Sequence, residues 1–134
     1  MIASMSDANK KLVRRVTEEM LMGNSGLASE LFAAPLVERQ IGLADMLRGA
    51  FPDLTLKVEV LIAEDDMVAC HWSAKGTQRG DVMGIAPTNA EASWTGTSIY
   101  QIADEKVVSV QTNWDVFELI QQLHDAAKQQ APST

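Results

Sequence analysis

Apolar residues in the first part of the chain have the spacing of helices. Over residues 7–22 they recur at every third or fourth position, which predicts a first helix with Ser6 or Asp7 as its cap. Prolines and glycines divide the residues that follow into shorter segments. Two more helices are predicted there, over residues 26–33, ending before Pro35, and over residues 41–50.

Beyond residue 53 the period of the apolar residues changes from about 3.6 to 2. Leu54, Leu56, Val58 and Val60 alternate with polar residues, which predicts a strand with these four side chains on one face. Helices followed by four antiparallel strands and a last helix are typical of an α+β fold, in which a curved sheet and its helices enclose a cavity. The later strands are expected over residues 67–78, 91–103 and 106–114, and the last helix over residues 116–129.

The strand over residues 67–78 predicts which side chains face that cavity. Its even positions are the more apolar set, so Cys70 and Trp72 are expected inside and Gln78 near the mouth. Cys70 then behaves as a small apolar residue rather than as a nucleophile. His71 is a candidate general base because imidazole titrates near neutrality, but the alternation places it on the outer face.

The length of the chain, its net charge and the positions of its two histidines argue against several classes of protein. The 134 residues fit one domain, residues 1–134, with a core over about residues 7–123. A net charge of −7 argues against nucleic acid and anionic membranes as partners. His71 and His124 lie on separate elements without carboxylates at ligand spacing, so no metal is expected.

The N-terminus and the single cysteine bear on the compartment. The first residues lack the charged and then apolar order of a signal peptide, and no apolar run reaches the roughly 20 residues that span a bilayer. Cys70, the one cysteine, forms no disulfide within the chain. A cytoplasmic location is therefore expected.

Asp115 stands where an apolar strand gives way to an amphipathic helix. One interpretation is structural, because Asp before a helix is a favoured N-cap and Glu118 three residues later fits a capping box. The other is catalytic, because a carboxylate held partly out of water beside aromatic side chains becomes a better proton acceptor. The two roles compete for the same oxygens, and the spacing leaves both open.

The stretch GTQRGDVMGIAPTNAEASWTG, residues 76–96, resembles the signature of the SnoaL-like polyketide cyclases, within the NTF2-like superfamily. The matching segment covers about residues 7–123 and also includes the motif AFPDL at residues 50–54. The resemblance implies an NTF2-like cone, a curved antiparallel sheet wrapped around N-terminal helices. The signature positions that match are Gly76, Thr77, Gly80, Gly84, Ile85, Pro87, Thr88 and Gly96.

The resemblance also implies a reaction. In the cyclases an aspartate at the position of Asp115 removes a proton from a carbon activated by carbonyls, and an intramolecular aldol condensation closes a ring without a cofactor. Gln78 stands where the family has a histidine, which removes a His–Asp pair. The resemblance further implies a small hydrophobic or aromatic polyketide-like substrate and a homodimer. Beside Asp115 and Gln78 as the catalytic candidates, the substrate-binding candidates are Trp72, Trp94, Met83, Asn113 and Trp114.

Two other functions are compatible with these residues. A non-catalytic protein that binds a small hydrophobic ligand is motivated by the loss of two family histidines, the one replaced by Gln78 and another in the segment after the second predicted helix. A cofactor-independent hydroxylase is the second, since relatives of the cyclases oxygenate similar substrates. Epoxide hydrolysis on this fold needs an Asp–Arg–Asp set, and none of the five arginines is expected on an inward strand position near Asp115.

Overall fold

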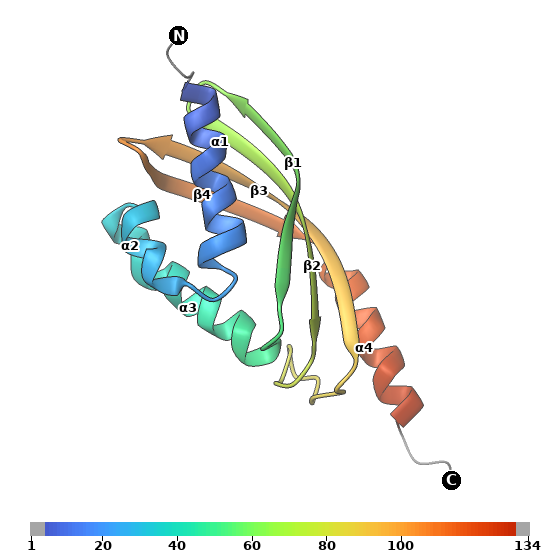
Figure 1. Cartoon of the computed structure of the whole chain (residues 1–134). Helices are drawn as coiled ribbons and strands as arrows, with labels where there is room; N and C mark the ends of the chain where they lie inside the picture. Colours follow the sequence, from blue (N-terminus) through green and yellow to red (C-terminus); the bar gives the residue numbers. More distant parts are fainter. Residues whose placement is uncertain (1–4, 131–134) are drawn as a thin grey trace.

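The computed structural model describes residues 5–130, and its centre is one antiparallel sheet in the order β1-β2-β3-β4. Each strand pairs with the next along the chain, and the sheet is long, curved and open (Figure 1). The predicted α+β class and strand order are therefore confirmed. The strands are β1 Thr55–Glu64, β2 Met67–Thr77, β3 Glu91–Ala103 and β4 Lys106–Trp114.

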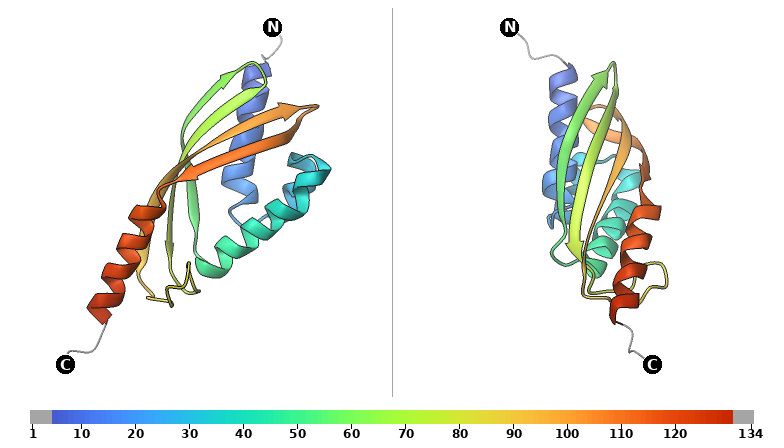
Figure 2. Two further views of the ribbon diagram at one scale, coloured as in Figure 1. Left: turned by 180° about the vertical axis from the view of Figure 1, so that it is seen from behind. Right: turned by 90° about the vertical axis from the view of Figure 1, so that its right-hand side faces the viewer.

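The helices before the sheet lie on one of its faces, and the last helix continues from the end of β4 (Figures 1 and 2). Helix α3 begins at Ala34 rather than near residue 41, so the predicted start was wrong. Pro35 opens this helix instead of separating two segments, because the first turn of a helix needs no N–H from it. The helices are α1 Met5–Arg15, the π-helix η1 Val16–Met20, the 3-10 turn η2 Ser25–Leu27, α2 Ala28–Leu31, α3 Ala34–Ala50 and α4 Val116–Gln130.

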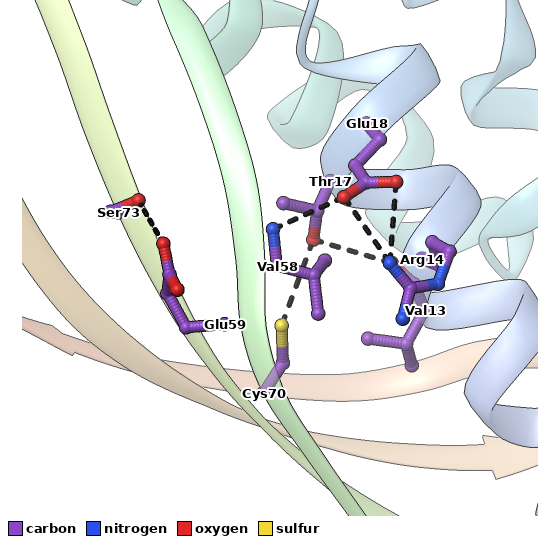
Figure 3. Close-up of polar contacts among 8 residues, drawn as sticks. All are labelled: Val13, Arg14, Thr17, Glu18, Val58, Glu59, Cys70 and Ser73. Atoms are coloured by element: carbon purple, nitrogen blue, oxygen red, sulfur yellow. Dashed lines mark hydrogen bonds and ion pairs between the residues drawn. The ribbon is translucent and has the colours of Figure 1, made fainter.

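The first helix differs from its prediction at both ends. Ser6 and Asp7 lie within the first turn of α1 rather than before it. The last residues of the predicted helix form the π-helix η1, a form that is rare and often found at functional sites. Thr17 in η1 is buried, donates to the Val13 carbonyl at 3.3 Å and lies 3.9 Å from the Cys70 sulfur (Figure 3). This turn therefore brings a hydroxyl group to the inner face of the sheet.

A β-bulge in β1 corrects the prediction that Leu54, Leu56, Val58 and Val60 share one face. Val58 pairs with Trp72 and Val60 with His71, so the residue between them is extra and the alternation reverses. Val58 is buried while Val60 is 47% exposed. The Glu18 carboxylate accepts a hydrogen bond from the Val58 amide at 3.2 Å, which ties η1 to the bulge (Figure 3).

Two apolar clusters stabilise the two ends of the sheet. One lies under α1 and η1 and includes Val13, Phe32 and Val68. The other joins the end of α3 to α4 and includes Phe51 and Leu119. Trp72 packs against both clusters, so the space between them is bordered by the sheet on one side and by η1 and α3 on the other.

Candidate functional site

A cavity of about 470 Å³ lies between the inner face of the sheet and the helices η1 and α3. Its walls are mainly apolar and include three indole rings, Trp72, Trp94 and Trp114. Trp94 and Trp114 pack with ring centres 6.4 Å apart. Aromatic walls of this kind bind flat molecules by burying their surface. All three substrate-binding candidates therefore lie on the cavity wall, and their part in binding stays a prediction.

Gly96 makes room for this arrangement. An added Cβ at Gly96 would lie 2.7 Å from Trp72 Cη2 and 2.8 Å from Trp114 Cβ, closer than carbon atoms approach. The Trp72 ring therefore lies across β3 only because residue 96 has no side chain. The glycine of the signature thus shapes the aromatic wall.

A row of hydrogen bonds crosses the sheet wall of the cavity. The Trp72 indole N–H donates to Ser98 Oγ at 3.1 Å, and Ser98 Oγ lies 2.8 Å from Thr112 Oγ1. Ser98 is 3% exposed, whereas Thr112 on the edge strand is exposed. The row therefore leads from solvent into the buried part of the cavity.

The deeper polar groups are uncharged at neutral pH. Burial raises the pKa of Tyr100 to about 12, against the opposing effect of hydrogen bonds from Ser98 and Thr17. Burial also raises the pKa of the Cys70 thiol above its usual value. Cys70 is buried between Thr17 and the sheet, which fits its predicted role as a small apolar residue. The inner cavity is therefore a neutral environment with hydroxyl groups.

Gln78 lies inside the loop that joins β2 to β3, rather than at the cavity mouth as predicted. Its side chain is fully buried, and its amide nitrogen donates to the carbonyls of Gly80 at 3.1 Å and Ile85 at 2.9 Å. Its amide oxygen accepts from the Thr88 amide at 3.1 Å and the Thr88 hydroxyl at 2.9 Å. All four hydrogen-bond positions of the amide are occupied within the loop. An imidazole has two nitrogens and could not replace these four bonds.

Asp115 is exposed and caps α4. Its Oδ1 accepts a hydrogen bond from the Glu118 amide at 2.9 Å, and its own amide donates to the Thr95 carbonyl at 2.8 Å. This is the N-cap interpretation of the sequence. Asp115 does not line the cavity, although Trp114 before it does. The expectation of a carboxylate withdrawn from water is corrected, because the strand ends at Trp114 and the next side chain turns to the helix.

The other candidates divide between the two faces of the sheet. Met83 lines the cavity from the β2–β3 loop, 62% exposed and with a φ of 47°. Asn113 is exposed and does not line the cavity, because it alternates with Thr112 and Trp114 along β4, so the geometry does not support it as a substrate-binding candidate. His71 is on the outer face, as predicted, with Nδ1 3.1 Å from Thr97 Oγ1.

Nothing in the part of the chain that the structure describes forms a cluster for a metal. Within residues 5–130, no three His, Cys, Asp or Glu side chains lie close enough to share an ion. His124 lies in α4 and His71 in β2, so the two histidines are on separate elements, as expected. Over the same residues, no helix has the length and apolar character needed to cross a membrane.

Comparison with known families and solved structures assigns the chain to a family and to a fold. The model of the SnoaL-like polyketide cyclases matches residues 37–123, more than half of the chain. The chain belongs to the SnoaL-like polyketide cyclase family. A search of curated proteins found no significant match. The family assignment therefore rests on the family model, and the expected NTF2-like fold is confirmed by solved structures.

Three solved structures of this fold cover nearly the whole chain. A candidate polyketide cyclase from Acidithiobacillus ferrooxidans is 23% identical with a TM-score of 0.80, over 92% of this chain and 99% of the other. IdmH from Streptomyces antibioticus, a candidate polyketide cyclase, is 21% identical with a TM-score of 0.75, over 87% and 98%. AclR from Streptomyces galilaeus, a candidate hydroxylase, is 25% identical with a TM-score of 0.70, over 91% and 98%.

Sequence reasoning missed the polar residues of the cavity, among them Gln40, Ser98 and Thr112. Ser98 occupies an even position of β3, whose even side chains face inward, so alternation on β3 would have found it. On β4 the register shifts at Val108, with Val107 buried and Val108 exposed, so alternation along that strand could not place Thr112. Gln40 lay outside the predicted helix over residues 41–50, so no face could be assigned to it. The structure places it on the cavity wall, 8% exposed.

Proposed function

We propose that the cavity binds a small, flat and mainly apolar polyketide-like molecule that carries several oxygen atoms. The cavity itself supports this most: about 470 Å³, with three indole rings in its wall and a narrow band of hydrogen-bonding groups. Apolar walls bind rings by excluding water, and a few polar groups orient them. Family membership supports the polyketide-like class of substrate.

For the reaction we propose cofactor-free ring closure by proton abstraction and an intramolecular aldol step, with Asp115 as the base. Family membership and the position of Asp115 beside Trp114 support this assignment. Oδ1 of Asp115 is held by the Glu118 amide, whereas Oδ2 has no hydrogen-bond partner among the described residues. One oxygen is thus available to take a proton from a substrate that extends past Trp114 to the edge of the cavity.

A second candidate function is binding without reaction. Among residues 5–130, the one carboxylate on the cavity wall is Asp81, which is exposed, and no histidine lines the cavity. The deeper polar groups, Ser98, Tyr100 and Thr17, are hydroxyls that do not take up a proton at neutral pH. A cavity of this chemistry suits storage or sensing of a ligand.

The matched variants Asp115→Asn and Asp81→Asn separate these functions. Asn keeps the cap of α4 but cannot accept a proton, so the fold is retained. With an aromatic ester that carries a β-dicarbonyl chain, we expect Asp115→Asn to lower turnover by at least about 100-fold and to leave tryptophan quenching by the substrate unchanged. Unchanged turnover in Asp115→Asn, with a loss in Asp81→Asn, would assign the base to Asp81. Binding without any product in the wild type would establish the binding function.

Oxygenation is tested in the same assay. A hydroxylase would consume dissolved oxygen when the substrate is added, whereas ring closure by proton transfer consumes none. We expect an oxygen electrode to record no uptake during turnover. Uptake in step with product would replace the cyclase proposal by the hydroxylase alternative.

We also propose a homodimer formed through the outer face of the sheet. Val60, Ile62 and Ile99 on that face are 47%, 63% and 40% exposed, which leaves an apolar surface uncovered in a single chain. Light scattering is expected to give twice the chain mass, and Ile62→Glu to give the monomer. A monomeric wild type would contradict the proposal.

A further inference from the structure

A buried glutamine without a hydrogen-bond partner lies on the helical wall of the cavity. Gln40 is 8% exposed, and its amide forms no hydrogen bond with any residue from 5 to 130. Leu43, Leu47 and Ala50 follow it at helical spacing on the same wall of α3 and are apolar. Neither atom of its amide is among the fully enclosed side-chain atoms that lack a partner, so the amide is open to the cavity. Its hydrogen-bond positions are therefore available to the contents of the cavity.

The sheet wall offers a second group with free hydrogen-bonding capacity. The Trp72 N–H can only donate, so Ser98 Oγ uses one acceptor position on it and pairs with Thr112 Oγ1 at 2.8 Å. Thr112 is the last member of this row and has no other side-chain partner among the described residues. Whichever hydroxyl donates in the Ser98–Thr112 pair, Thr112 retains at least one position for a ligand.

The groups around these two side chains favour an uncharged ligand. Tyr100 on the cavity wall and Cys70 in the adjoining core cluster both keep their protons at neutral pH, since burial raises the pKa of each. The charged side chains on the cavity wall, Arg39 and Asp81, are both exposed and opposite in sign. A carboxylate drawn into the cavity would lose its hydration without gaining a buried cation. The net charge of −7 adds a general repulsion.

From this arrangement we infer that Gln40 and Thr112 are specificity-determining residues that select neutral ligands carrying two oxygen functions, one for the helical wall and one for the sheet wall. Each function is a carbonyl or hydroxyl, since an amide and a hydroxyl both donate and accept. The aromatic walls supply affinity for the ring system, and the two polar residues orient it. This inference rests on the proposed binding function of the cavity.

Three two-ring probes test it: 1,5-dihydroxynaphthalene, naphthalene and 1-naphthoate, with binding followed by quenching of tryptophan fluorescence. The wild type is expected to bind the diol about tenfold more tightly than naphthalene, and 1-naphthoate least tightly. Gln40→Leu and Thr112→Val should each weaken binding of the diol by roughly 3- to 10-fold, as for loss of one neutral hydrogen bond. Binding of naphthalene should be unchanged or slightly tighter in both variants.

A matched control is Gln121→Leu in α4, which makes the same change at an exposed position outside the cavity. It should bind all three probes as the wild type does. Equal binding of naphthalene and the diol by the wild type would overturn the inference and leave the binding function in place. Parallel weakening of both probes in Gln40→Leu would overturn it as well. If no probe binds, the proposed binding function fails, and the inference fails with it.

Discussion

Two buried glutamines show how differently the same side chain is used in this protein. Gln78 has all four hydrogen-bond positions of its amide occupied by the loop between β2 and β3. Gln40 is almost as buried, yet its amide has no partner among the described residues and lies on the cavity wall. A satisfied buried amide stabilises a local structure, whereas an unsatisfied one is available to a ligand. Partners, rather than burial, therefore distinguish the structural glutamine from the binding glutamine.

The largest expected effect comes from Gln78→Leu. Leucine fills a similar volume but leaves two carbonyls and two donors of the loop unpaired, so we expect the free energy of unfolding to fall by about 3 kcal/mol. Urea denaturation followed by circular dichroism measures the change. A loss below about 1 kcal/mol would mean that water replaces the glutamine, and the contrast with Gln40 would disappear.

The next prediction concerns Tyr100, the buried phenol on the wall of the same cavity as Gln40. Its pKa is about 12 in the folded chain and about 10 when unfolded, so above about pH 10 the unfolded chain releases a proton that the folded chain keeps. The stabilisation is complete below about pH 10 and is lost as the pH rises toward 12, up to about 2 to 3 kcal/mol. Denaturation at about pH 8 and pH 11 should show this loss, and Tyr100→Phe should lack it.

The same residue gives a direct spectroscopic check. Tyr100 is the only tyrosine in the sequence, so absorbance of the ionised phenol reports on it alone. Titration of the folded protein should give a midpoint well above the usual value near 10. A midpoint near 10 would mean that the phenol is hydrated and the inner cavity is wetter than its walls suggest.

A smaller effect on stability is expected at Asp115, because only Oδ1 of its carboxylate accepts a hydrogen bond from the described residues. Asp115→Ala removes the cap of α4 and should lower the free energy of unfolding by about 1 kcal/mol, whereas Asp115→Asn should change it by a few tenths. Thermal denaturation of the two variants measures the difference. Equal losses would show that the charge, rather than the cap, stabilises the helix, and would weaken the use of Asp115→Asn as a purely catalytic variant.

The smallest expected effect on stability is that of Gln40→Leu. It removes an unpaired amide from an apolar wall, so the free energy of unfolding should stay within about 0.5 kcal/mol or rise slightly. This is the same substitution as at Gln78, measured in the same urea assay. A loss near that of Gln78→Leu would show that Gln40 has a structural partner, and the comparison between the two residues would fail.

Residue spacing along the chain was enough to predict the order of the elements and the family. Alternation of apolar residues on β2 correctly placed Trp72 inside and His71 outside, because side chains of a strand alternate regardless of what surrounds it. The signature glycines, such as Gly96, could be recognised because close contacts leave no room for a side chain there. These properties are local, and local spacing suffices to predict them.

Which polar groups face the cavity depends on contacts that form only in the folded chain. A single bulged residue in β1 reversed its alternation and moved Val60 to the outside, a change that hydropathy does not record. The turn after Trp114 makes Asp115 the cap of α4, and the loop encloses Gln78, although the sequence offered both as catalytic candidates. Gln40 and Thr112, far apart in the chain, became two walls of one cavity because the sheet curves over α3. Hydrogen-bond partners are set by contacts between distant segments, and spacing along the chain does not contain them.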